Sequence, residues 1–214
     1  MTAQSTEDVS IWITTGTPTK DTVASATKAA PSVVTVSAAA EAYVEGDLVL
    51  IYETESDNLN GVWCAGNPSG TQFTALSSNT VNDTVTVSKG FVDHYLQDDL
   101  TKLCLSAINI NGTEPNTISV ATFCEPTATI DSQVQEAGTL TMEGYVDVTS
   151  SDYPALYEAW QLGDERLIRI DLGPDQGWLV ARGRVSSVNW SVPIDGAIAY
   201  TFSMTLTEAF KHCF

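Results

Sequence analysis

The side chains that carry out most enzyme chemistry are scarce in this sequence and poorly spaced for it. His94 and His212 are the two histidines, too few for a multi-histidine metal site. Asp93 precedes His94 and could orient its ring, but no serine or cysteine stands in a nucleophile-elbow sequence. We therefore interpret His94 as an ordinary surface histidine and not as a general base.

Carboxylates are plentiful, but their spacing does not match acid–base catalysis. Adjacent pairs such as Asp98-Asp99 and Asp164-Glu165 do not face one another across a cleft, as the two carboxylates of a glycosidase must. The segment 57–61 has the start of a calcium loop without its later glutamate, so we interpret it as a turn. There is also no P-loop and no GxGxxG sequence. The sequence predicts a protein that is not an enzyme and has no metal site and no cofactor.

The four cysteines are not arranged as a metal or redox motif. Cys64, Cys104, Cys124 and Cys213 show no CxxC spacing and stand in apolar or strand-like segments. We expect reduced thiols packed among other side chains.

The chain is strongly acidic, with 27 acidic residues, nine basic residues and a formal net charge of -18. Proteins that hold nucleic acids by their phosphates need clustered Lys and Arg, whereas the basic residues here are scattered. This distribution argues against tight binding of DNA or RNA. The polar start of the chain lacks the features of a secretory signal, and no run approaches membrane-spanning length, so we expect no membrane partner.

The first third of the chain predicts short β-strands separated by turns. Residues 9–15 alternate apolar and small side chains, as a half-buried strand does, and residues 15–32 are rich in Thr, Ala, Ser, Pro and Gly. We predict an N-terminal strand and extended arm over 1–32. Four β-type runs between Gly- and Asn-rich turns predict a β-hairpin insertion over 33–80.

The remainder, 81–214, predicts the main β-sandwich body, which forms one structural domain with strand 9–15. Its expected strands are 83–88, 100 onward, 117–124, 139–148, 165–172, 178–188 and 198–206. One helix is expected at 151–162, capped by Ser151 or Asp152 and ended by Gly163. Tyr153, Leu156, Tyr157 and Trp160 recur at helical spacing, so we expect this face to pack on a sheet.

Three long segments are informative when taken together: LCLSAINI at 103–110, TISVATFCEPTATI at 117–130 and ARGRVSSVNWSVPIDGAIAYTFSMTL at 181–206. They resemble the core of the tail tube proteins of long-tailed phages, the lambda-like family of siphophages. Segment 45–76 is similar to the β-hairpin insertion of some members. The resemblance spans roughly residues 9–206 and implies a mainly β, antiparallel sandwich- or barrel-like fold with one flanking helix.

The resemblance also implies a function and a set of partners. Copies of the chain would form hexameric rings that stack into a tube, together with the tape measure protein and other tail proteins. Genomic DNA would pass through without tight binding. The location implied is the virion tail, after assembly in the bacterial host cytoplasm.

A channel that carries DNA should repel phosphates, which gives the acidity of the chain a specific meaning. We predict that Asp131, Glu136, Glu143 and Asp147 line the lumen, because they flank or occupy the expected inner strands. The alternative is that these carboxylates face outside solvent.

A phage receptor-binding or capsid-decorating β-domain is the alternative function, since short strands and turns also suit surface recognition. In such a domain, aromatic residues would gather in loops. Here the tryptophans fall mainly in periodic segments, and only Trp63 is close to the turn-rich insertion, which favours packing.

Overall fold

The computed structural model describes residues 10–83, 87–111, 117–120, 128–131, 138–147, 151–173, 176–194 and 196–214. The fold is mainly β and antiparallel, with one α-helix among these residues, as the sequence predicted. Among the same residues, no helix has both the length and the apolar character needed to cross a bilayer.

Short strands make up most of the chain, and they follow one another in sequence order. They are β1 (Ser10–Thr14), β2 (Thr19–Ala26), β3 (Ser32–Val36), β4 (Leu48–Tyr52), β5 (Gly61–Ser69), β6 (Gln72–Ala75), β7 (Phe91–Tyr95), the 3-10 turn Gln97–Asp99, β8 (Leu100–Leu103), β9 (Ala107–Asn111), β10 (Thr117–Val120), β11 (Ala128–Asp131), β12 (Thr139–Tyr145), α1 (Asp152–Leu162), β13 (Glu165–Asp171), β14 (Trp178–Ser191), β15 (Ala199–Leu206) and β16 (Lys211–Cys213).

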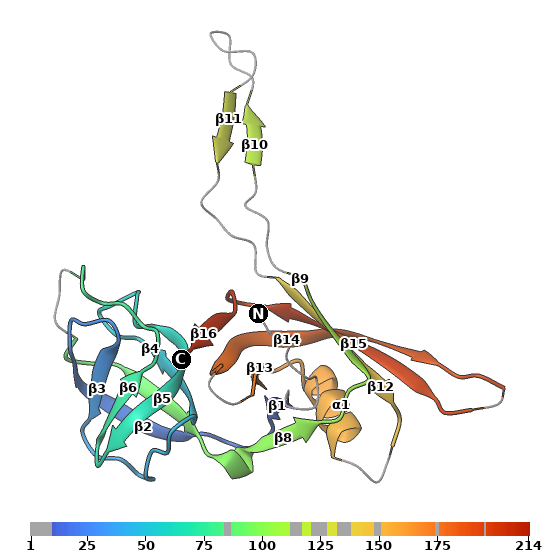
Figure 1. The fold of residues 1–214 in the computed structure, drawn as a ribbon, viewed down its shortest axis with the longest axis horizontal. Coiled ribbons are helices and arrows are strands. Elements are labelled where there is room, and N and C mark those ends of the chain that lie inside the picture. Colours follow the sequence, from blue (N-terminus) through green and yellow to red (C-terminus); the bar gives the residue numbers. More distant parts are fainter. Residues whose placement is uncertain are drawn as a thin grey trace.

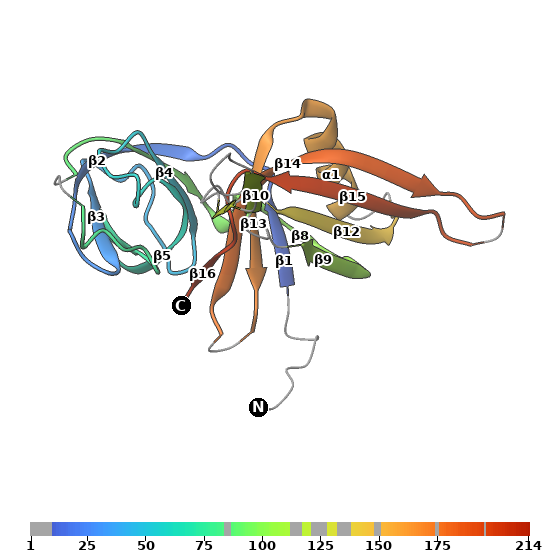
Figure 2. The same cartoon turned by 90° about the horizontal axis from the view of Figure 1, so that it is seen from above.

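Most of these strands belong to one of two bodies that share a border (Figures 1 and 2). An eight-stranded antiparallel sheet runs in the order β8-β1-β13-β14-β15-β12-β9, with β16 paired to β14. Strands β2, β3, β6, β5, β4 and β7 close into a six-stranded barrel. Strands β10 and β11 pair with each other as a separate two-stranded ribbon.

The barrel is inserted between two strands that are neighbours in the main sheet. Strand β1 pairs with β8, so the chain leaves the sheet after Thr14 and returns to it at Leu100. At this point the amides of Thr15 and Gly16 both donate to the carbonyl of Asp99, at 2.8 and 3.1 Å. These bonds hold the exit and the return of the chain together.

The segment 15–32 differs from the extended arm that its composition predicted. Thr19–Ala26 forms β2, which pairs with β3 and β7 and helps to close the barrel. Val23 and Ala26 are buried in the barrel core, so the strand is held by two apolar side chains among small polar ones. The alternation was therefore too weak to identify a strand from the sequence.

The runs predicted within 33–80 are confirmed as strands β3 to β6. These strands belong to the closed barrel and do not form separate hairpins. The predicted strand 83–88 lies partly outside the described residues, and Val87 makes an isolated bridge to Ala26. The division of the chain at residues 32 and 80 stays a prediction.

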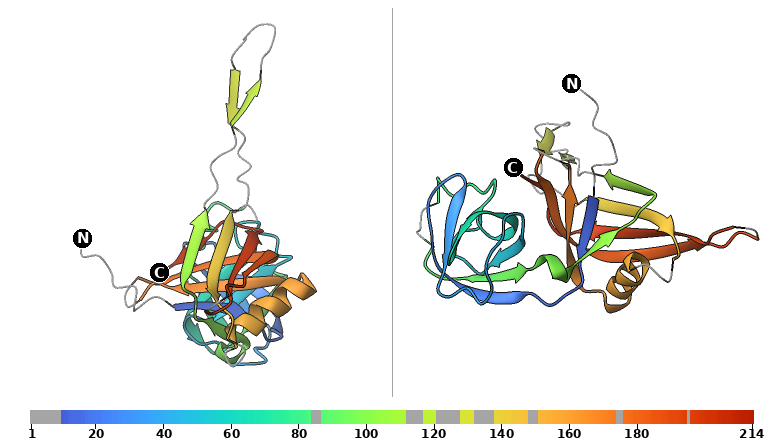
Figure 3. Two further views of the ribbon diagram at one scale, coloured as in Figure 1. Left: turned by 90° about the vertical axis from the view of Figure 1, so that its right-hand side faces the viewer. Right: turned by 60° about the horizontal axis from the view of Figure 1, so that its bottom comes forward.

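Helix α1 confirms the predicted helix and ends as expected. Gly163 takes the left-handed conformation, with φ of 65°, and its amide donates to the carbonyl of Ala159. Neither predicted cap acts at the start of the helix. Ser151 makes no side-chain cap, and the buried Asp152 carboxylate accepts a bond from the amide of Cys104 instead. Figure 3 shows α1 packed beside the curved main sheet.

Candidate functional site: a two-faced sheet

Four neighbouring strands of the main sheet, β9, β12, β15 and β14, form a surface with two chemically different faces. Side chains directly opposite one another in an antiparallel register point to the same face, and they alternate along each strand. The register of these strands therefore assigns each side chain to a face.

One face is apolar and forms the main core with α1. Met142 lies opposite Phe202, and both are fully buried; Tyr200, on the same face, is 1% exposed. Leu156 of the helix is also fully buried in this cluster. Gly144 lies opposite Tyr200. A larger residue would not fit at this position, because a Cβ there would lie 2.5 Å from the tyrosine hydroxyl.

The other face is polar and consists mainly of small hydroxyl and amide side chains. We name it the polar face. It comprises Ala107, Asn109 and Asn111 from β9, Thr139, Thr141, Glu143 and Tyr145 from β12, Ala199, Thr201, Ser203 and Thr205 from β15, and Arg184, Ser187, Asn189 and Ser191 from β14. Its described charges are one carboxylate, Glu143, and one guanidinium, Arg184.

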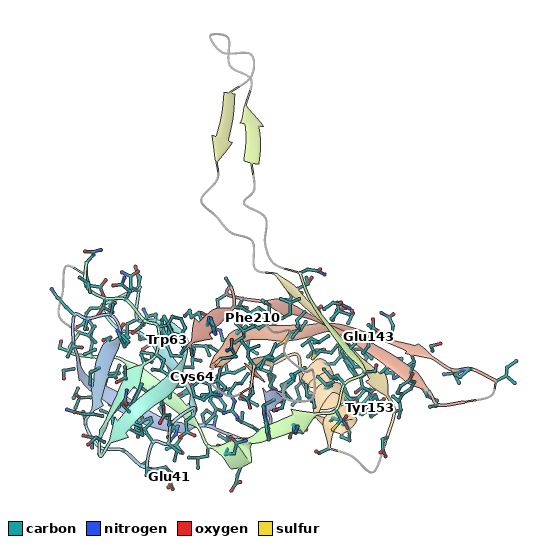
Figure 4. The ribbon with its side chains drawn as sticks, viewed as in Figure 1. Glu41, Trp63, Cys64, Glu143, Tyr153 and Phe210 are labelled. Carbon is teal, nitrogen blue, oxygen red and sulfur yellow. The ribbon has the colours of Figure 1, made fainter. Side chains whose placement is uncertain are left out.

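The four predicted lumen carboxylates have different outcomes. Glu143 lies on the polar face, opposite Thr201 of β15 and Ala107 of β9, and Figure 4 labels it on this sheet. Asp147 is exposed, two residues beyond the end of β12. Asp131 ends β11, and Glu136 lies outside the described residues. The structure thus brings one of the four onto the polar face.

Both lateral borders of this four-stranded surface are open to further pairing. Within the described part of the chain, β9 pairs with β12 on one side and with no strand on the other. Strand β14 pairs with β13 from Trp178 to Arg184 and no further. Among the described residues, its distal half, from Ser187 to Ser191, therefore pairs with β15 alone. Because neighbouring strands alternate in direction, β9 and β14 run in opposite directions.

The helix face predicted from the sequence lies against this same sheet, but its members are buried to different extents. Leu156 is fully buried, whereas Tyr153, Tyr157 and Trp160 are partly buried against the core. Their rings continue to Trp190 of β14: Trp160 and Trp190 meet edge to face at 6.1 Å, and the Trp190 indole donates to the Tyr153 hydroxyl. Two buried alanines of the helix, Ala155 and Ala159, complete the contact. Spacing alone did not identify them, because small residues carry a weak periodic signal.

His94 is not the surface residue that its neighbours in sequence suggested. It is fully buried in the barrel, where its Nε2 lies 2.8 Å from the Asp47 carboxylate and its ring stacks on Tyr43 at 4.3 Å. Tyr43 in turn donates to the buried Asp21 at 2.6 Å. Because these buried groups contact one another and not a nucleophile, we interpret the cluster as a packed polar core of the barrel.

The structure also tests the packing predicted for Trp63 and for the cysteines. Trp63 is buried in the barrel core and donates to the carbonyl of Leu59 at 2.7 Å, so it is a packing residue. Cys64 and Cys213 are buried free thiols, as expected, whereas Cys104 is exposed. Cys124 lies outside the described residues. Among those described, no group of three or more His, Cys, Asp or Glu side chains is placed to hold a metal ion.

Comparisons with known proteins give partial structural likenesses. No protein-family model matches the sequence, and no curated protein matches it. A chain in the tail of an empty gene transfer agent particle with C6 symmetry is 15% identical, and the likeness covers 51% of this chain and 82% of that one at a TM-score of 0.40.

Two further solved structures are similar to the same degree. A chain from the virion of a native gene transfer agent is 14% identical over 56% of this chain and 92% of that one, with a TM-score of 0.45. The SPP1 tail tube protein is 13% identical over 53% of this chain and 69% of that one, with a TM-score of 0.42. In each case the likeness covers little more than half of this chain.

Proposed function

We propose that this chain is a structural subunit of a phage tail tube, in which six copies form a ring and the rings stack into a hollow tail. The polar face of the four-stranded sheet lines the channel through which genomic DNA passes. The observation that carries the proposal is the division of this sheet into an apolar face covered by α1 and a polar face without large apolar side chains other than Tyr145.

The open borders of the sheet support the ring. A strand with unpaired amides and carbonyls is a template for pairing with another chain. Since β9 and β14 run in opposite directions, the β9 of one copy placed beside the distal half of β14 in the next continues the antiparallel order. This contact joins two different surfaces and repeats around an axis until the ring closes.

The chemistry of the polar face supports passage without retention. Binding of DNA through its phosphates requires lysine and arginine side chains that displace counterions. Here the face offers mainly uncharged hydroxyl and amide groups, and its one arginine is matched by Glu143. The net charge of the whole chain, -18, adds a field that repels phosphates. The channel wall thus confines the DNA without binding its phosphates.

The location and remaining partners follow from this role. The tube belongs to the virion tail and is assembled in the cytoplasm of the bacterial host. A tape measure protein and the other tail proteins contact the stacked rings.

Electron microscopy of the purified full chain at increasing concentration tests the assembly. We expect hollow tubes with sixfold symmetry, in which a reconstruction places Glu143 and Thr141 toward the bore. A chain that stays monomeric at every concentration, or tubes with the polar face outside, would refute the proposal.

The role of the polar face is tested with a pair of lysine substitutions, Thr141→Lys and Asn189→Lys, in one variant. We expect tubes of this variant to retain short DNA duplexes at low salt in a nuclease-protected form and to release them as salt rises. The matched control carries lysines on the exposed side of β2, Thr22→Lys and Ser25→Lys. DNA held by the control should remain open to nuclease, because it binds outside. Equal protection in both variants would place the polar face outside the bore.

A further inference from the structure

The barrel and the main sheet are joined by a core of their own. Buried side chains from both bodies form a third cluster, which includes Leu48 and Cys64 from the barrel and Leu167, Val180 and Cys213 from the main sheet. Figure 4 labels Cys64 and Trp63 at this junction. The two bodies are therefore in apolar contact where strand β16 passes the barrel strand β5.

Two cysteines lie inside this junction. Cys64 belongs to β5 and Cys213 to β16, and neither side chain has exposed surface. Both side chains belong to the third cluster, and their strands β5 and β16 lie next to each other. Two buried thiols on neighbouring strands can form a disulfide bridge, provided that the strands adjust to bring the sulfur atoms within bonding distance.

Contacts between residues that precede the two cysteines also link these two segments. The amide of Val62 donates to the Glu208 carboxylate at 3.3 Å. The ammonium of Lys211 lies 3.8 Å from the centre of the Trp63 ring and 2.9 Å from Glu208. The approach of the two cysteines is therefore part of a connected set of contacts between β5 and the segment around β16.

The two thiols differ in the ease with which they ionise. Burial raises the pKa of the Cys64 thiol, whereas the interaction with Cys64 lowers the pKa of the Cys213 thiol. Cys213 is the sulfur that more readily becomes a thiolate, the form that attacks a disulfide.

The strand that carries Cys213 also gives a route to solvent. Strand β16 has three residues and pairs with β14 alone. A short strand at the edge of a sheet, with few backbone bonds, opens locally at a low free-energy cost compared with the core strands. Such an opening uncovers Cys213 while the other strands of the main sheet stay paired.

We propose that Cys64 and Cys213 form a disulfide modification site, which closes a covalent clasp between the barrel and strand β16 when the protein meets a small-molecule disulfide such as oxidised glutathione. The Cys213 thiolate attacks one glutathione sulfur and expels the other half as a thiolate. The Cys64 thiolate then attacks the Cys213 sulfur of the mixed disulfide and expels the second glutathione. Both cysteines are oxidised, one glutathione disulfide is reduced to two thiols, and the two cysteine protons end on these thiols.

The clasp acts on stability through the unfolded chain. It closes a loop of about 150 residues, which removes conformational freedom from the unfolded state. Because strain in the native state lowers the gain expected from chain entropy alone, a rise in melting temperature of about 5 °C is the expected size. The clasp does not depend on the proposed tube function.

The test treats the full native chain with oxidised glutathione and then blocks free thiols under denaturing conditions. Peptide mapping should find a Cys64–Cys213 link, and the melting temperature should rise by about 5 °C and return when dithiothreitol is added. The control variant, Cys104→Ser with Cys124→Ser, keeps both cysteines of the pair and should show the same link and the same shift.

Two outcomes would overturn the proposal. The first is glutathione attached to Cys104 or Cys124 with no link between Cys64 and Cys213. The second is a link that forms but lowers the melting temperature, which would mean that the strands must be forced together. The Cys213→Ser variant should lose the shift, and because mapping of the unmodified chain is decisive by itself, the test does not depend on that variant folding.

Discussion

Replacing Arg169 by methionine tests how strongly one buried cation ties the barrel to the main sheet. Arg169 lies on β13 and is 6% exposed. Its Nη1 donates to the carbonyl of Gly46 at 2.8 Å, and its Nη2 donates to the Gln97 side chain at 3.1 Å. Its Nε lies 3.1 Å from a carboxylate oxygen of Asp171, an ion pair without the angle of a hydrogen bond.

The expected cost follows from the partners that methionine leaves behind. The buried carbonyl of Gly46 would lose a bond from a charged donor, which costs about 1 to 3 kcal/mol. Asp171 would lose its cation but keep the bond from the Trp12 indole at 3.0 Å, and its side chain is 24% exposed, so its share is smaller. Methionine retains much of the aliphatic packing. We therefore expect Arg169→Met to lower the free energy of unfolding by about 3 kcal/mol.

Urea unfolding of the variants measures this cost. Arg184→Met, at an exposed position on β14, is the matched control and should change the free energy of unfolding by about 0.5 kcal/mol or less. Adding Asp171→Asn to Arg169→Met should recover part of the loss, because a neutral amide no longer needs a cation. A loss below about 1 kcal/mol for Arg169→Met, or no recovery in the double variant, would refute this account of the junction.

Three further predictions concern the helix and the core. Leu156→Ala should lower the free energy of unfolding by about 2 to 5 kcal/mol, because the side chain is fully buried. Trp160→Ala should lower the free energy of unfolding by less than is usual for a fully buried tryptophan, since its ring is only partly buried. Chemical unfolding of the two variants compares these losses. Gly163→Val should cost about 1 kcal/mol, whereas Gly163→Asn should be tolerated, since φ at this position is 65°; thermal melts separate them. Burial raises the pKa of Tyr200 to about 12, so its contribution to stability is complete below about pH 10 and is lost as the pH rises toward 12; Tyr200→Phe should make the fall in stability over this window less steep in alkaline unfolding curves.

The long periodic segments were predictable from the sequence because each combines a strong local pattern with tertiary packing that agrees with it. Helix α1 and strands β12, β14 and β15 have regular apolar positions, and the core uses those positions. Strand β2 was missed for the opposite reason. Two buried apolar residues, Val23 and Ala26, hold it, and its pairing partners come from distant parts of the chain.

The candidate site divides in the same way. Glu143 could be selected from the sequence because it stands on a strand with clear alternation, which assigns it to the face opposite Leu140 and Met142. The partners that surround it, Ala107 and Thr201, could not be selected, because the register between strands is a long-range property. The burial of His94 beside Asp47 was also hidden, since its partner lies 47 residues away.

Local pattern and composition were enough to establish the class of the protein: a mainly β chain with one amphipathic helix, an acidic charge and no catalytic motif. A linear chain already contains these properties, because they depend on neighbouring residues and on totals. Three other properties required the folded chain: strands β2 to β7 close into a barrel, one face of β9-β12-β15-β14 is mainly polar, and Cys64 and Cys213 are buried in one cluster. Each of these depends on which distant strands pair and in which register, and that choice is made by the packing of the whole core.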